Sequence, residues 1–320
     1  MRRRAFLQRA GVAGAALAAA VARGAAGEEK GGKEAAKSKT RMGGPLPTIQ
    51  LGSLEVSRFI LGSNPFWGYS HQSPELNEEM KNWHTDERIV QILDEAARCG
   101  LTAVVAPPDQ RWVDLWTKYR AAGGKLGIWV AQCHEASDMM EAEIDRAVKA
   151  GAHAVFIQGH RVEQQFVNAK FDTLRRWIDR IKNAGIPGGF AAHWPEIHRE
   201  LQKRKFPADF YCQCCYNITR PGAMGEPYHE ADRKIAMEAI RAIERPVVAY
   251  KILGAGRLRA ADGFEQAFGA IRRKDGVCVG IWAKEAIDQI RENATLTEML
   301  SAKAAGAQAT GRPTPKESHA

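Results

Sequence analysis

Short apolar runs alternate with amphipathic stretches along the middle of the chain. Eight runs of mostly β-branched, aromatic or small residues, bounded by Gly, Pro or Asn, predict buried strands. They cover residues 59–61, 102–106, 127–131, 154–157, 189–192, 210–215, 247–252 and 277–282. The amphipathic stretches predict helices over residues 86–98, 136–150, 171–184, 230–243 and 283–292. This alternation favours a (β/α)8 TIM barrel, with a doubly wound open sheet as the alternative.

The glycine pattern bears on the choice between these folds. No GxGxxG motif follows a predicted strand, which counts against an open sheet that binds a dinucleotide. In a barrel, the chemistry lies at the C-terminal ends of the strands. The residues that follow each predicted strand are therefore the candidate site.

The first 27 residues have the pattern of an export signal. Arg2, Arg3 and Arg4 precede Phe6 and Leu7, and a run of Ala, Gly and Val follows. This order resembles a twin-arginine signal, and the apolar run is short for a bilayer span. An uncleaved basic anchor is the alternative. We predict recognition by the twin-arginine translocation machinery, a periplasmic location and no stable membrane span after cleavage.

Composition and charge limit the class of protein and its partners. A content of 45% hydrophobic and 26% charged residues is globular and excludes a disordered, collagen-like or multi-span membrane protein. Residues 1–27 contain five Arg and no acidic residue, so without them the net charge falls from +9 to +4. The other basic residues are scattered, so we expect a small-molecule substrate and no nucleic acid.

These observations divide the chain into four parts. Residues 1–27 are the signal, residues 28–45 a flexible linker rich in Lys, Gly and Glu, and residues 301–320 a disordered tail. Residues 46–300 form the barrel domain, and about 250 residues is a typical length for one barrel. The six cysteines lack the spacing of a zinc knuckle, and most lie in apolar stretches, which predicts buried free thiols.

Histidines follow three consecutive predicted strands. His134, His160 and His193 could together bind a divalent metal that polarises a carbonyl group. Each could instead make only local hydrogen bonds. Acidic residues follow two of the strands, and the candidate catalytic residues are Asp109, His134, Glu135 and His160.

The loop after the first predicted barrel strand is rich in aromatic residues. Beside a barrel mouth it could form a lid or a stacking surface for a sugar, or it could simply plug the barrel. The candidate substrate-binding residues are Asn64, Trp67, His71, Trp194 and Lys251. Lys251 could contact a phosphate or carboxylate group or, if desolvated, form a Schiff base.

Several motifs occur in the order found in the aldo-keto reductases. Residues 51–58 (LGSLEVSR), leading into Leu61-Gly62, resemble the short hairpin and first barrel strand of that family. Residues 95–101, 158–160, 209–217 and 247–254 resemble its first helix, fourth strand end, sixth strand and seventh strand. The resemblance covers about residues 48–298 and implies a barrel that binds NADP. It implies cofactor contacts from Gln213, Tyr250, Lys284 and Asn293, with Tyr250 stacked on the nicotinamide.

The chain departs from that family at the catalytic positions. Residues 103–112 contain no Tyr, and Gln132 takes the place of the family's Lys. Only His160 matches the catalytic set, and Ala192-His193-Trp194 replaces the Ser-Asn that would hold the carboxamide. In the family the Tyr donates a proton and the Lys lowers its pKa, so carbonyl reduction by that route is not expected here.

Three functions are consistent with these residues. The favoured hypothesis is a divergent, NADP-linked oxidoreductase that acts on a small carbonyl or carbohydrate-type substrate with a non-standard catalytic set. The second is a metal-assisted lyase, isomerase or hydrolase that acts on a carbohydrate. The third is a non-catalytic binding protein built on the barrel.

Overall fold

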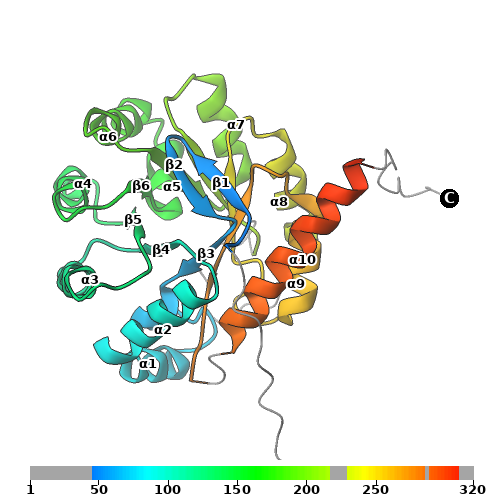
Figure 1. Ribbon diagram of the computed structural model, residues 1–320. Helices are drawn as coiled ribbons and strands as arrows, with labels where there is room; N and C mark the ends of the chain where they lie inside the picture. Colours follow the sequence, from blue (N-terminus) through cyan, green and yellow to red (C-terminus); the bar gives the residue numbers. More distant parts are fainter. Residues whose placement is uncertain (1–44, 217–228, 285–287, 310–320) are drawn as a thin grey trace, which may run out of the picture. The chain divides into compact units, whose positions relative to one another are not determined.

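Eight parallel strands close into a barrel in the computed structural model, which describes residues 45–216, 229–284 and 288–309 (Figure 1). The strands are β3 (Phe59–Gly62), β4 (Ala103–Ala106), β5 (Ile128–Cys133), β6 (Ala154–Ile157), β7 (Gly188–Ala192), β8 (Phe210–Cys214), β9 (Val247–Tyr250) and β10 (Gly276–Gly280). Each pairs with the next along the chain, and β10 closes the ring on β3, with Val277 opposite Phe59. This closure confirms the predicted (β/α)8 barrel and excludes the open sheet.

Helices connect the strands and cover the outside of the barrel (Figure 1). They are η1 (Asn64–Trp67), α1 (Pro74–Trp83), α2 (Asp86–Arg98), α3 (Gln110–Ala121), α4 (Met140–Lys149), α5 (Gly159–Val167), α6 (Phe171–Asn183), α7 (Pro195–Lys203), α8 (Glu230–Ala242), α9 (Ala260–Ala270) and α10 (Gln289–Ala309). Side-chain caps begin three of them, because Ser73, Thr85 and Asp109 accept backbone N–H groups in the first turns of α1, α2 and α3.

An antiparallel hairpin closes the N-terminal end of the barrel. It consists of β1 (Thr48–Leu51) and β2 (Leu54–Ser57). Ile49 lies against Gly276 at the start of β10, and Gly52 lies against Asp209 just before β8. Leu51 and Val56 are fully buried and join the apolar side chains inside the barrel. The interior is therefore sealed by apolar packing at the end from which the strands start.

The two ends of the chain were predicted to be a signal with a linker and a disordered tail. Helix α10 continues to Ala309, so a tail beginning at residue 301 was predicted too early. The predicted signal and most of the linker lie outside the described residues, as do residues 310–320.

The six cysteines are free, as predicted, and burial raises the pKa of every thiol. Within the described ranges, no helix is long and apolar enough to cross a membrane.

Candidate active site

A cavity of about 960 Å³ lies at the C-terminal ends of the barrel strands. Side chains inside the barrel form its floor, among them Ile60, Phe210 and Leu51 of the hairpin. Loops that follow β3, β7 and β9 form much of its wall. Its size is within the range of small-molecule sites, about 300–1,000 Å³. The cavity is therefore the candidate active site, at the end of the barrel where the sequence predicts the chemistry.

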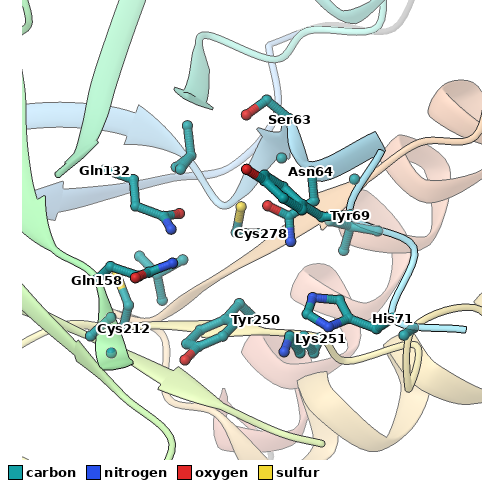
Figure 2. Close-up of a pocket in the computed structure, with 18 of the residues that line it drawn as sticks. Ser63, Asn64, Tyr69, His71, Gln132, Gln158, Cys212, Tyr250, Lys251 and Cys278 are labelled. Atoms are coloured by element: carbon teal, nitrogen blue, oxygen red, sulfur yellow. The ribbon is translucent and has the colours of Figure 1, made fainter. Parts of the chain in front are cut away.

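All the residues predicted to contact substrate line this cavity: Asn64, Trp67, His71, Trp194 and Lys251. Tyr69, whose residue surface is 53% exposed, and Trp282 add two more aromatic rings. Figure 2 shows Asn64 and Tyr69 on the side of the cavity opposite Gln132 and Gln158. Aromatic faces with uncharged polar groups between them suit a small molecule that carries several hydroxyl groups.

His193 is held by a buried carboxylate. It follows β7, and its Nδ1 lies 2.8 Å from Oε1 of Glu163, which also accepts the His193 backbone N–H at 2.6 Å. The side chain of Glu163 is only 6% exposed and that of His193 only 16%. Because an ionised carboxylate can only accept, Nδ1 carries the hydrogen and Nε2 is left as an acceptor. The pair therefore has the geometry of a general base on the cavity wall.

His134 forms a second pair of the same kind with Glu143. Nδ1 of His134 lies 3.3 Å from Oε1 of Glu143. Oε2 of Glu143 accepts the backbone N–H groups of His134 and Glu135, both at 2.7 Å. The interaction with the Glu143 carboxylate raises the pKa of His134. The side chain of His134 is 37% exposed, so this imidazole lines the cavity at a wetter position than His193.

Three of the predicted catalytic residues lie apart from these pairs. Asp109 caps α3, where Oδ1 accepts the N–H of Trp112 at 2.8 Å, so its carboxylate has a structural role. Glu135 points to Arg146, at 3.7 Å, and does not line the cavity. His160 does line the cavity, but it is exposed in the first turn of α5. The residue that directly follows β6 on the cavity wall is Gln158.

The metal site predicted from His134, His160 and His193 is not assembled. Across the described ranges, no three His, Cys, Asp or Glu side chains come together in a way that could hold a metal ion. Nδ1 of His134 and Nδ1 of His193 contact separate carboxylates, Glu143 and Glu163.

Two glutamine side chains project into the cavity from neighbouring strands. Gln132 lies in β5 and Gln158 directly follows β6, and Figure 2 shows both amide groups directed into the cavity. Among the residues described, neither side-chain amide has a hydrogen-bond partner. Each amide offers donors and an acceptor, so the two groups are suited to bind hydroxyl or carbonyl oxygens of a ligand.

Tyr250 ends β9 beside His193. Its hydroxyl donates to the carbonyl of Ala192 at 3.3 Å, and its ring lies edge-on to the His193 ring with centroids 6.2 Å apart. Burial raises the pKa of Tyr250, which keeps the phenol protonated. Tyr250 therefore packs against the part of the cavity wall that carries His193.

The other residues through which the resemblance implies an NADP site do not reach the cavity. The amide of Gln213 is fully buried and donates to the carbonyls of His193 and Cys214, both at 3.0 Å. Lys284 forms an ion pair with Glu79 of α1. Asn293 is 1% exposed in α10. Only Tyr250 of this set lines the cavity.

Sequence reasoning missed Glu143 and Glu163, which orient the two cavity histidines. Both lie in helices among buried apolar positions, Glu143 beside Ile144 and Glu163 beside Val162. An acidic residue on the apolar face of a helix is unusual, because a buried charge needs a partner. That pattern was present in the sequence and could have indicated both residues.

Comparisons with known proteins agree on the fold. No protein-family model and no curated protein matches the sequence. A proposed aldo-keto reductase from Pseudomonas aeruginosa has a TM-score of 0.57 and 16% identity, over 81% of this chain and 98% of its own. Another structure described in the same way, from the same organism, gives 0.53 and 15% over 78% and 94%. A mandelate oxidase variant with an FMN adduct gives 0.51 and 14% over 82% and 78%. The chain therefore has an aldo-keto-reductase-like barrel fold.

Proposed function

We propose that this chain is a barrel enzyme that transfers protons on a small, polyhydroxylated carbonyl compound, as an isomerase or a lyase. The observation that carries the proposal is the pair of His193 and Glu163 on the cavity wall. The carboxylate fixes the ring and stabilises the imidazolium that forms when Nε2 takes a proton. A proton acceptor at this place favours chemistry at the carbon next to a carbonyl group.

The proposed step uses only side chains that line the cavity. Nε2 of His193 removes the proton from the carbon next to the carbonyl, and the electron pair of that bond moves to the carbonyl oxygen. The amide N–H groups of Gln132 and Gln158 donate to the enediolate oxygens. In an isomerisation, His193 returns this proton to the former carbonyl carbon, while the proton of the neighbouring hydroxyl group passes to the former carbonyl oxygen. In an elimination, the C–O bond on the next carbon breaks, and His193 gives the proton to the hydroxyl group, which leaves as water.

Deuterium exchange tests this step directly. Purified protein is incubated in D2O with a panel of aldoses, ketoses and keto sugars, and deuterium at the carbon next to the carbonyl is followed by NMR. We expect exchange with the wild-type protein, and a loss of about 10²–10⁴-fold in His193→Gln. Binding of a panel compound with no exchange by the wild-type protein would instead support a non-catalytic binding barrel.

A nicotinamide-linked oxidoreductase is the second candidate function. It is favoured by Tyr250, which ends β9 on the cavity wall, the position where the resemblance implies a ring stacked on nicotinamide. The positions of Gln213, Lys284 and Asn293 oppose it. Titration with NADPH decides, because binding beside Tyr250 would change the fluorescence of the nicotinamide and would weaken in Tyr250→Ala.

We also propose export to the periplasm through the twin-arginine translocation machinery. The support is the order of Arg3, Arg4, Phe6 and Leu7 in the sequence, which lies outside the described residues. Conversion of both arginines to lysine should keep the protein in the cytoplasm, as measured by fractionation. Equal amounts in the periplasm for wild type and the double variant would contradict this export route.

A further inference from the structure

Two loops meet at one side of the cavity mouth. One contains His71 and Gln72, and the other contains Lys251, Ala255 and Arg257; we call their meeting place the mouth junction. Nε2 of Gln72 donates to the carbonyl of Ala255 at 2.8 Å. Nη2 of Arg257 donates to the carbonyl of His71 at 3.2 Å. These bonds fix the two loops to each other although they are far apart in the sequence.

The backbone of the mouth junction adopts unfavourable conformations. Five non-glycine residues have positive φ in the described ranges, and three of them are here: His71 at 58°, Lys251 at 58° and Ala255 at 54°. Residues with side chains occupy this region only where the surrounding structure holds them, and such positions cluster at binding sites. Glycine is the residue that this backbone conformation favours, but His71 and Lys251 stand at these positions.

Among the residues that the structure describes, the mouth junction also brings together positive charge with no acidic residue to balance it. Figure 2 shows the Lys251 side chain beside the His71 ring, and both residues line the cavity. In the described part of the chain, the Lys251 ammonium has no hydrogen bond or ion pair. Burial, with the nearby charges of Lys251 and Arg257, lowers the pKa of His71 to about 3. Glu163 is the one acidic residue among the described residues lining the cavity, and it pairs with His193.

We propose that the mouth junction binds an oxyanion, a carboxylate or phosphate group carried by the substrate, with Lys251 as the charge partner and His71 as a neighbouring imidazole. A cation that lines a cavity without a partner gains a favourable interaction when an anion binds. That the anion belongs to the substrate rests on the proposed function, whereas the binding of the anion does not. Within the proposed class of polyhydroxylated carbonyl compounds, the substrate is then one that carries a carboxylate or a phosphate group.

Titration with simple anions tests the proposal without a known substrate. Protein labelled at histidine is titrated with inorganic phosphate and with acetate, and with sodium chloride at matched ionic strength, while the His71 resonances are followed by NMR. We expect a saturable shift with at least one oxyanion and none with chloride. Saturation by acetate alone indicates a carboxylate-bearing substrate, and by phosphate alone a phosphorylated one. No saturable shift with either oxyanion overturns the proposal.

Variants at position 251 separate binding from folding. Lys251→Gly removes the ammonium at a φ that glycine prefers, so the variant should fold at least as stably as the wild type. We expect it to bind the oxyanion about tenfold or more weakly, and Lys251→Arg to retain most of the affinity. Lys118→Met removes an exposed lysine from α3 and should change nothing. Equal affinity in wild type and Lys251→Gly would refute the assignment.

The anion site and the proposed reaction can fail separately. His193→Gln should abolish proton exchange but keep the oxyanion shift at His71. If the wild-type protein shows no exchange while the shift still depends on Lys251, the anion site stands and the proposed reaction falls. If exchange depends on His193 and no oxyanion binds, the reaction stands and the anion site falls.

Discussion

His134 and His193 are built into the barrel by the same arrangement but face different surroundings. Each follows a strand, and each donates its backbone N–H to a glutamate whose other contact is with the Nδ1 of the same histidine, at 3.3 Å for His134 and 2.8 Å for His193. Glu143 comes from α4, the helix that follows His134, whereas Glu163 comes from α5, the helix that follows the neighbouring strand β6. The His134 side chain is 37% exposed, and the His193 side chain is 16% exposed and packs beside Tyr250.

The two carboxylates differ in the groups that they bind. Oε2 of Glu143 is occupied by two backbone N–H groups, so this carboxylate mainly fixes the loop after β5. Glu163 directs both of its contacts to His193 alone. We therefore assign proton transfer to His193 and loop anchoring to Glu143, and the following predictions test that division.

The largest expected effect is on the exchange reaction. Glu163→Gln should lower the deuterium exchange rate by about 10²-fold or more, because an amide no longer selects the Nδ1–H tautomer or stabilises the imidazolium. Glu143→Gln, its matched control, should change the rate by less than about tenfold. A similar loss of exchange in both variants would show that His134 takes part in proton transfer as well.

His198 has no carboxylate partner, and we expect its contribution to the stability of the fold to fall as the pH is lowered. His198 is fully buried, its Nε2 contacts the carbonyl of Cys212 at 3.2 Å, and burial lowers its pKa from 6.5 to about 4. Its contribution to stability is complete above about pH 6.5 and is lost as the pH falls toward about 4, because only the unfolded chain then takes up the proton. The loss is up to about 3 kcal/mol. Urea unfolding across this range should show a flatter pH dependence for His198→Gln than for the wild type.

Removing the anchoring carboxylate should cost stability. Glu143→Ala leaves the backbone N–H groups of His134 and Glu135 without their acceptor, so we expect the free energy of unfolding to fall by about 2 kcal/mol. Glu163→Ala frees one backbone N–H, that of His193, together with the Nδ1–H of its ring. Because that ring lines the cavity and can be hydrated there, we expect the smaller loss for this variant. Urea denaturation of both variants at one pH measures the difference. A larger loss for Glu163→Ala would reverse the assignment of anchoring to Glu143.

The smallest effect concerns the pKa of His134. Glu143 raises this pKa, so the ion pair contributes its full stability below about pH 6.5 and loses it as the pH rises through the raised value. Because the side chain is partly exposed, the contribution should stay below about 1 kcal/mol. The difference in Tm between wild type and His134→Gln should shrink from pH 6 to pH 9. A constant difference would mean that the pair is not charged.

The barrel strands were predictable because they are short apolar runs closed by glycine or proline. The strand Ala154–Ile157 was predicted with its observed bounds. Helix α1 was missed because only Met80 in it is buried, so it has little apolar periodicity. Its start signal was present, since Ser73 accepts the N–H of Leu76 and Pro74 follows the cap.

The position of the candidate site was predictable from the sequence, but the His–Glu and Lys–Glu pairs around it were not. The strand-end rule placed His134, His193 and Lys251 on the cavity. The rule could not show that Glu163, from the helix after β6, would reach across to His193 after β7. The ion pair of Lys284 was not predictable for the same kind of reason, because its partner Glu79 lies in the helix that was missed.

The hairpin at the N-terminal end of the barrel has a consequence for turnover. Leu51 of the hairpin is fully buried and forms part of the cavity floor. A molecule in the cavity contacts apolar packing at the floor. Substrate and product must therefore pass through the same mouth, between the loop that follows β3 and the loop that carries Lys251. Product that has not left blocks the next substrate, and a product that keeps an anionic group should act as a competitive inhibitor.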